Sequence, residues 1–203
     1  SCLALYKGAI AVNEYGKRFV DESISYKLLG DAVMAQPYHT SFQIFDQPIF
    51  DSGDDRVRIL DFSRRMEEGL IIKADTLQAL AQQIEVPYET LQATVDRYNG
   101  FCDRGEDEEF GRKKLVHNHG ALRRIETGPF YAYPSTAAVF GTYCGLRVDA
   151  SLRVLDVFGE VIEGLYAAGE VIGGFHGGAY MTGSALGKAV VLGRVAATSA
   201  TNR

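Results

Sequence analysis

Two short stretches near the N-terminus have the hydrophobic pattern of β-strands. GAIAVN (residues 8–13) is mostly apolar, a turn-forming run follows at residues 14–17, and RFV then continues in extended form. SFQIFD (residues 41–46) alternates between polar and apolar residues. Because a period of two is typical of a half-buried strand, we expect strands at both places.

A helical period begins near residue 75. Apolar residues recur at positions 77, 80 and 84, and Asp75 is expected to cap this helix. Pro87 suits the first turn of a second helix, with apolar residues at 91, 95 and 98. We expect that helix to stop at Asn99-Gly100. Together the two segments predict a small helical hairpin.

The chain becomes rich in strand patterns after Pro129. LRVD and LRVLD flank a turn at Ala150-Ser151 and predict a β-hairpin. LYAAG (residues 165–169) predicts another strand, a glycine-rich loop follows, and an apolar helix pattern ends the chain. The change near residue 140, from mixed helices to a compact β-then-helix arrangement, marks the best internal boundary.

Composition and charge exclude several classes of protein. Of 203 residues, 46% are hydrophobic and 23% are charged, as in ordinary globular domains. A net charge of −5 and the lack of a basic stretch argue against a nucleic-acid surface. No apolar run reaches the length of a membrane span. The chain opens without Met or a signal-peptide pattern, as if cut from something longer, so a cytoplasmic location is expected without a readable targeting signal.

Three further groups of residues have ordinary interpretations. Cys2, Cys102 and Cys144 are too scattered for a zinc or redox motif, so we expect free thiols in a reducing compartment. The acidic run EDEE (residues 106–109) predicts a solvated loop. His117 and His119 form an H-x-H pair with no third ligand in view, so no metal site is expected.

Seven glycines fall between residues 164 and 183, more than a connecting turn requires. A strand, a glycine-rich loop and a helix N-terminus favour binding of an anion or a dipole, because amides near Ser184 and Ala185 lack helical partners. Glu170, at the end of the strand, could accept hydrogen bonds from a ribose hydroxyl. The alternative is a tight turn whose glycines serve packing alone. Neither GxGxxG nor a Walker lysine motif is present.

The order of these motifs resembles that of the fumarate reductase / succinate dehydrogenase-like flavoproteins, which include 3-ketosteroid dehydrogenases. GAIAVNEYGKRFVDES, the helix pair IEVPYETLQATVDRYNGFCDRGEDEEFGR, GPFYAYPSTAAVFGTYCGLRVD and GLYAAGEV with its following HG all carry the likeness. The resemblance covers effectively the whole chain.

The resemblance implies an α+β fold in two parts and FAD as cofactor. Residues 1–141 would form the capping (substrate) domain, with mixed strands and a helical pair. Residues 142–203 would supply a hairpin, strand and helix of the FAD-binding α/β domain, without the N-terminal Rossmann half. Gly169 and Glu170 would then meet the ribose of the adenosine half. The backbone of Ser184, Ala185 and Leu186 would meet the isoalloxazine ring.

The chain departs from the fumarate reductase pattern where that pattern places charge. Tyr26 stands at the position of the proton-donating arginine, and Tyr180 at that of a carboxylate-binding arginine. Phe140 and Gly141 replace paired histidines. Because a dicarboxylate would be desolvated there without a cation, fumarate is not the expected substrate.

The tyrosines resemble those of the 3-ketosteroid dehydrogenase branch. In that branch Tyr180 and the Ser184 amide would polarise a ketone oxygen, and Tyr26 would move the proton on the neighbouring carbon. The hydride would pass to or from flavin N5. Gly141, Thr142 and Ser184 would line the substrate site. The resemblance thus implies an FAD-dependent oxidoreductase acting on a CH–CH bond beside a carbonyl of a small molecule, with an unidentified electron partner.

Alternatives stay open at this point. Each tyrosine could be a packing residue with a bonded hydroxyl, and His176 is expected to support the flavin site rather than to act as acid or base. The chain could instead belong to a reductase of an unsaturated acid that uses Lys7 or Arg147. It could also be an isolated capping domain without turnover.

Overall fold

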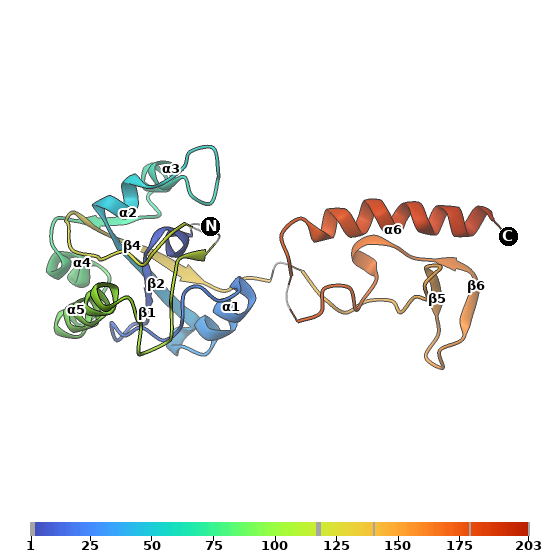
Figure 1. The fold of residues 1–203 in the computed structure, drawn as a ribbon, viewed down its shortest axis with the longest axis horizontal. Coiled ribbons are helices and arrows are strands. Elements are labelled where there is room, and N and C mark those ends of the chain that lie inside the picture. Colours follow the sequence, from blue (N-terminus) through green and yellow to red (C-terminus); the bar gives the residue numbers. More distant parts are fainter. Residues whose placement is uncertain (1–2, 117–118, 140, 179, 203) are drawn as a thin grey trace. The chain divides into compact units, whose positions relative to one another are not determined.

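The computed structural model describes residues 3–116, 119–139, 141–178 and 180–202 (Figure 1). Cys2, His117 and Phe140, which figure in the predictions above, lie outside the described residues. The chain divides into two compact units, residues 1–138 (unit 1) and 139–203 (unit 2), and each is described by itself.

Unit 1 contains a four-stranded antiparallel sheet in the order β1-β2-β4-β3. Both predicted strands are confirmed: β1 lies within the predicted range 8–13, and the predicted range 41–46 lies within β2. The elements of unit 1 are η1 (Ala4–Lys7), β1 (Ile10–Val12), α1 (Tyr26–Met34), η2 (Pro37–His39), β2 (Thr40–Asp46), α2 (Gln47–Asp51), α3 (Phe62–Glu67), β3 (Ile72–Ala74), α4 (Leu77–Gln83), α5 (Tyr88–Arg104) and β4 (Phe130–Thr136).

A single large core holds unit 1 together. Apolar residues of β1, β2, α4 and α5 are buried in one cluster, with Ile10, Ile44 and Leu91 fully inside. The ring of Tyr131 stacks between Phe45, at 5.4 Å, and Phe50, at 4.6 Å between ring centroids. Side chains that large contribute most of the hydrophobic stabilisation of such a core.

The helical hairpin forms as predicted, but both of its predicted boundaries are wrong. Thr76, not Asp75, caps α4, because its hydroxyl accepts the Ala79 amide at 3.1 Å. Helix α5 continues past Asn99-Gly100 to Arg104 and ends at Gly105, which adopts φ 72°. The Asn99 side chain does not break the helix because it bonds both backbone groups of Ile125, at 2.8 and 2.9 Å.

Unit 2 has a short antiparallel sheet and one long helix. Its elements are β5 (Arg153–Leu155), β6 (Val161–Tyr166), η4 (Gly169–Val171) and α6 (Ser184–Thr201). The predicted turn at Ala150-Ser151 is present, with Val148 opposite Val154. The predicted strand LYAAG ends earlier, at Tyr166, and Gly169 and Glu170 lie in the η4 turn.

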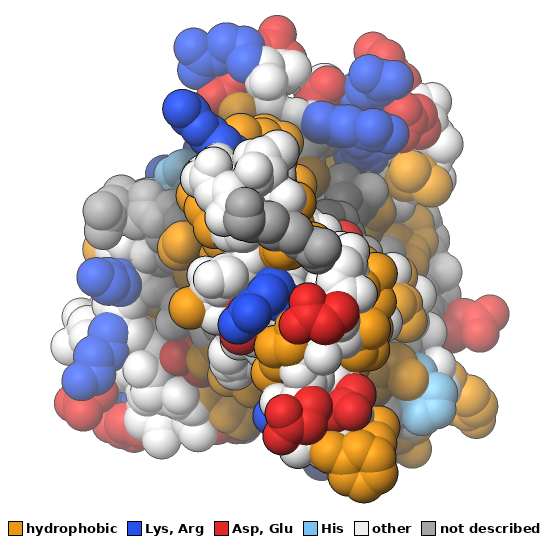
Figure 2. Space-filling view, turned by 90° about the vertical axis from the view of Figure 1, so that its right-hand side faces the viewer, with side chains coloured by type: hydrophobic (Ala, Val, Ile, Leu, Met, Phe, Trp, Pro, Cys, Tyr) orange, Lys and Arg blue, Asp and Glu red, His pale blue; other side chains and the backbone are white. Residues whose placement is uncertain are grey.

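The core of unit 2 is small, and much of its apolar surface is exposed. Val154, Ala167 and Ile172 form its buried cluster. On α6, Leu186, Val190 and Val191 are each at least 60% exposed, and Figure 2 shows hydrophobic side chains among charged ones on the face it presents. Among the described residues, no helix is long and apolar enough to cross a membrane.

Candidate functional site

A buried network of charges fixes the segment that leads into Tyr26. Arg18 holds Glu22 with two hydrogen bonds, of 2.9 and 2.8 Å, and Asp107 with a third of 2.8 Å. Arg112 lies 3.2 Å from Glu22, and the Ala11 amide donates to the same carboxylate at 3.1 Å. All four charged side chains are fully or almost fully buried. Two cations therefore balance two anions inside unit 1, as burial of charge requires.

The pKa values in this network follow from its ion pairs. Burial alone would lower the pKa of Arg18, but its bonds to Glu22 and Asp107 raise that pKa above its usual value. Burial alone would raise the pKa of Asp107, but Arg18 and nearby backbone amides lower it. Both groups thus stay charged at neutral pH.

The predicted solvated loop at residues 106–109 is wrong at its centre. Asp107 is 3% exposed because it pairs with Arg18 and accepts the amides of Glu109, Phe110 and Arg112. Within the described part of the chain, no group of three or more acidic, histidine or cysteine side chains could hold a metal. Cys102 and Cys144 are free thiols.

Tyr26 is the first residue of α1, directly after this anchored segment. Ser25 caps the helix by accepting the Leu28 amide at 3.4 Å. The Tyr26 side chain is 37% exposed. Tyr6 lies near it: burial raises the pKa of Tyr6, and the neighbouring Tyr26 raises it further.

Part of the glycine-rich loop of unit 2 is built for close backbone packing. A β-carbon on Gly145 would lie 2.4 Å from the carbonyl oxygen of Val171, and one on Gly173 would lie 2.7 Å from the Gly145 nitrogen. Leu146 bonds both sides of this crossing through its amide and carbonyl, at 2.9 and 3.1 Å. For Gly173 of the glycine-rich loop, which crosses Gly145, the packing interpretation is correct.

The start of α6 lacks a side-chain cap. Gly183, at φ 90°, occupies the cap position and makes no side-chain hydrogen bond. The prediction of a free Ser184 amide is wrong, because that amide donates to the Met181 carbonyl at 3.0 Å. Among the described residues, the amides of Ala185 and Leu186 have no acceptor. Two donors and the positive end of the helix dipole thus remain available there.

A buried lysine that the sequence analysis missed lies beneath this helix start. Lys188 is 1% exposed, and its Nζ lies 3.4 Å from His176 Nε2, 3.5 Å from the Ile172 carbonyl oxygen and 3.5 Å from a Glu170 carboxylate oxygen. His176 Nδ1 in turn lies 3.3 Å from the Ser184 hydroxyl. Unit 2 therefore brings together Glu170, Ser184 and His176 around one cation.

Tyr180 is held by a second tyrosine of the same unit. Its amide donates to the Tyr143 hydroxyl at 2.8 Å. The His176 ring lies between the two, with centroids 5.4 Å from Tyr143 and 5.1 Å from Tyr180.

The remaining predicted substrate residues and alternative cations are dispersed. Gly141 and Thr142 are exposed, and a β-carbon on Gly141 would lie 3.3 Å from Glu170 Oε1. Lys7 lies in η1 of unit 1. Arg147 lines a hollow of unit 2 with Tyr143.

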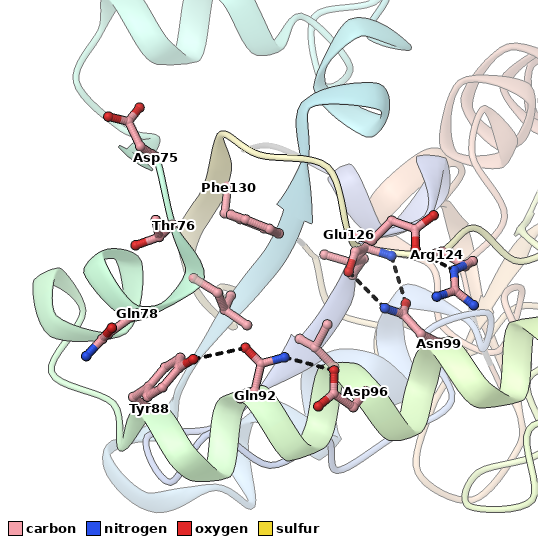
Figure 3. Close-up of a pocket in the computed structure, with 13 residues that line it drawn as sticks. Asp75, Thr76, Gln78, Tyr88, Gln92, Asp96, Asn99, Arg124, Glu126 and Phe130 are labelled. Carbon is pink, nitrogen blue, oxygen red and sulfur yellow. Dashed lines mark hydrogen bonds and ion pairs between the residues drawn. The ribbon is translucent and has the colours of Figure 1, made fainter.

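A hollow of about 510 Å³ in unit 1 lies between α4, α5 and the segment before β4 (Figure 3). Its polar side chains bond one another: Tyr88 donates to Gln92 at 3.3 Å, and Gln92 donates to Asp96 at 2.8 Å. No predicted site residue lines it. It therefore has no link to the predicted chemistry.

Periodicity and charge patterns gave no signal for Arg112, Tyr6 or Lys188. Arg18 and Glu22 do stand four residues apart within GKRFVDE, a spacing that could have indicated their pairing. Arg112 and Asp107 offered no such clue. Arg112 reaches the Leu5 and Ala9 carbonyls, and Asp107 reaches Arg18, only through contacts between residues far apart in the sequence.

Comparisons with known proteins place these two units in context. The model of the FAD binding domain family matches residues 4–186. The chain is 39% identical over 196 residues to the NADH:acrylate oxidoreductase of Vibrio harveyi, covering 95% of this chain and 18% of that protein.

Solved structures match both predicted branches. A flavocytochrome c3 fumarate reductase in an open conformation matches with a TM-score of 0.72 and 30% identity, covering 97% of this chain and 33% of that one. The 3-ketosteroid delta1-dehydrogenase from Sterolibacterium denitrificans, in complex with 1,4-androstadiene-3,17-dione, matches with a TM-score of 0.80 and 28% identity, covering 100% of this chain and 41% of that one. The predicted α+β class and the predicted resemblance are confirmed. The chain spans less than half the length of each of these proteins.

Proposed function

The chain belongs to the FAD binding domain family of flavoproteins, and from that premise we propose that it is part of a longer oxidoreductase that acts on a CH–CH or C=C bond beside a carbonyl. Unit 1 would serve as the capping domain, and unit 2 as the last segment of the FAD-binding domain. The apolar surface that α6 exposes supports a larger domain around unit 2.

The residues of unit 2 fit the cofactor. Two unpartnered amides at the start of α6 and a buried cation beneath it suit a group that gains negative charge. We assign the Ala185 and Leu186 amides to the isoalloxazine ring, and Glu170 with the Gly169 backbone to the ribose of the adenosine half. When bound, FAD supplies the hydride acceptor or donor.

Tyr26 and Tyr180 are proposed to handle proton and carbonyl. The Tyr180 hydroxyl would donate a hydrogen bond to the substrate oxygen, which acidifies the adjacent C–H. The Ser184 amide already donates to the Met181 carbonyl, so Tyr180 alone is assigned to the substrate oxygen. Tyr26, at the exposed start of α1, would take the proton in dehydrogenation and return it in reduction.

One observation favours a carbonyl substrate over fumarate. Tyr26, Tyr180 and Gly141 place no formal charge where the fumarate reductase pattern has cations. The Arg18 and Arg112 guanidinium groups cannot substitute, since both are buried and paired. A dicarboxylate would therefore lose its hydration without a compensating ion pair.

The 39% identity to an NADH:acrylate oxidoreductase favours a second candidate, a reductase of an unsaturated monocarboxylic acid. In the complete flavoprotein, steady-state assays with cyclohex-2-en-1-one, acrylate and fumarate separate the candidates. The ketone proposal expects the enone to give the largest kcat/KM and fumarate the smallest. A larger kcat/KM for acrylate would support the second candidate.

Two substitutions test the tyrosines in the same complete protein. Tyr26→Phe should slow flavin reduction about 10²- to 10⁴-fold and leave substrate binding nearly unchanged, as loss of a general acid–base group does. Tyr180→Phe should weaken both binding and reduction, since its hydrogen bond exists in the ground state and strengthens in the transition state. Stopped-flow bleaching of the flavin measures both effects. A Tyr26→Phe protein that reduces its flavin at the parent rate would refute the acid–base role.

A further inference from the structure

Unit 1 contains a second cavity, of about 390 Å³, beneath α1, and we call it the α1 pocket. Tyr26, Leu29, Gly30 and Val33 of α1 line one side, and residues 41, 43 and 133–136 of β2 and β4 line the other. Its volume lies in the range of pockets that hold small organic molecules. Tyr26 thus connects this cavity to the proposed chemistry.

No charged side chain lines the α1 pocket within the part of the chain that the structure describes. A carboxylate inside it would lose its hydration without a cation to replace it. Leu29, Val33 and Pro134 offer apolar contact instead. The lining therefore selects for an uncharged ligand body.

The sheet side of the pocket carries a small polar group of fixed orientation. Ser41 lies opposite Ser135 in the β2–β4 register and Gln43 lies opposite Tyr133, so these side chains share one face of the sheet. Gln43 accepts the Leu5 amide at 3.3 Å and donates to the Ser135 hydroxyl at 2.9 Å. These two hydrogen bonds fix the orientation of the Gln43 side-chain amide, whose NH2 group donates to the Ser135 hydroxyl.

Ser41 differs from its neighbours. It is 3% exposed, and its hydroxyl makes no hydrogen bond among the described residues. Its oxygen is not among the fully buried side-chain atoms that lack a partner, so it reaches the open space of the cavity that Ser41 lines. It can donate to a carbonyl or exchange bonds with a hydroxyl of a bound molecule.

We propose that the α1 pocket binds the uncharged body of the substrate, with an apolar ring or chain against Leu29 and Val33 and a hydroxyl or oxo group on Ser41. The claim that the bound molecule is the substrate rests on the proposed function of Tyr26. The claim that the pocket binds an uncharged molecule does not, because every residue that lines the pocket belongs to unit 1.

Binding to the 203-residue chain tests the pocket without flavin or turnover. Two probes of similar shape are used, 4-ethylphenol, which is neutral at pH 7, and 4-ethylbenzoate, which is anionic. Methyl signals of Leu29 and Val33 in ¹³C-resolved NMR report occupancy. We expect 4-ethylphenol to shift them saturably and 4-ethylbenzoate to bind at least tenfold more weakly.

Three variants place the binding in the pocket. Ser41→Ala should weaken 4-ethylphenol binding about 3- to 10-fold, the loss expected for one hydrogen bond. Gly30→Leu should weaken it more than tenfold, because its β-carbon has ordinary contact at 3.7 Å with Ala137 and the rest of its side chain would take up pocket space. Gly100→Leu is the matched control, since Gly100 lies in a helix away from the pocket. It should leave binding unchanged.

The results separate this inference from the proposed function. Three outcomes would refute binding of an uncharged molecule in the α1 pocket. They are the absence of saturable shifts, equal binding of 4-ethylbenzoate, and unchanged binding of 4-ethylphenol to the Gly30→Leu chain. If the NMR spectrum of Gly30→Leu shows that this variant is unfolded, the effect of Ser41→Ala on 4-ethylphenol binding alone decides whether the ligand lies in the α1 pocket. If 4-ethylphenol binds and the Tyr26→Phe enzyme still reduces its flavin at the parent rate, the α1 pocket is supported and the acid–base role of Tyr26 is refuted.

Discussion

The two units hold their buried charges in different ways. Unit 1 buries two arginines and two carboxylates in contacts of 2.8–3.2 Å, whereas unit 2 buries Lys188 with polar contacts of 3.4–3.5 Å. In unit 1, side chains cap α1, α2, α3 and α4, whereas α5 of unit 1 and α6 of unit 2 both begin without a side-chain cap. Most polar groups of the unit 1 network are paired within the protein and serve its stability, although Nη1 of Arg18 and Nε of Arg112 make no hydrogen bond among the described residues. Groups left with weak or no partners are those that can bind something else.

The size of the cores follows the same division. Unit 1 has one continuous core from most of its elements, whereas the buried apolar cluster of unit 2 has three members among the described residues. In unit 1, the buried pairing of Glu22 with Arg18 anchors the segment that precedes Tyr26. Unit 2 presents backbone donors on a surface with little internal support.

The largest expected effect is at the centre of the unit 1 network. Glu22→Gln should lower the free energy of unfolding of unit 1 by about 3–5 kcal/mol, since it leaves two buried guanidinium groups short of an anion. Urea unfolding followed by the methyl signals of Leu91 measures the change. Asp31→Asn is the control, because it breaks only the exposed pair with Lys27 and should cost less than about 1 kcal/mol. Equal costs for the two variants would contradict the structural role of the network.

Acid should weaken unit 1 through Asp107. Because the folded state lowers the pKa of Asp107, its contribution to stability is complete above the unfolded value of about 4 and is lost as pH falls through the lower folded pKa. Urea midpoints at pH 7, 5 and 3 should therefore drop mainly in the last step. In Asp107→Asn this drop should be smaller, and an unchanged drop would assign the acid sensitivity to other carboxylates.

A smaller effect distinguishes the two candidate caps of α4. Thr76→Ala should cost about 1 kcal/mol, because the Ala79 amide loses its acceptor. Asp75→Ala should cost a few tenths at most. Urea unfolding of both variants ranks them directly, and the reverse order would restore the cap predicted from the sequence.

This pair also shows where sequence reasoning stops. Periodicity identified the strands, the helical pair and α6, because those patterns reflect which face of an element is buried. It could not choose between Asp75 and Thr76, since both side chains are good caps and only the backbone path decides. The predicted stop at Asn99-Gly100 was wrong because Asn99 bonds Ile125, 26 residues away.

The candidate site divides in the same way. Motif order located Tyr26, Glu170 and the start of α6, and their roles stay predictions. The burial of Asp107 and Lys188 was missed because each looks like a solvated residue within its own segment. Only the tertiary contacts with Arg18 and His176 reveal it.

At Lys188 we expect a change in stability no larger than that at the Thr76 cap. Lys188→Met keeps a side chain of similar length and removes a buried charge whose contacts are all long, so unfolding of unit 2 should change by no more than about 1 kcal/mol. The substitution should nevertheless alter His176. A lysine ammonium can only donate, so Nε2 of His176 accepts from it and Nδ1 carries the proton toward the Ser184 hydroxyl. Without Lys188 nothing selects that tautomer, and ¹⁵N shifts of the ring should move toward a mixture. A loss of several kcal/mol instead would mean that Lys188 is structural, as the charges of unit 1 are, and the contrast between the two units would fail at that residue.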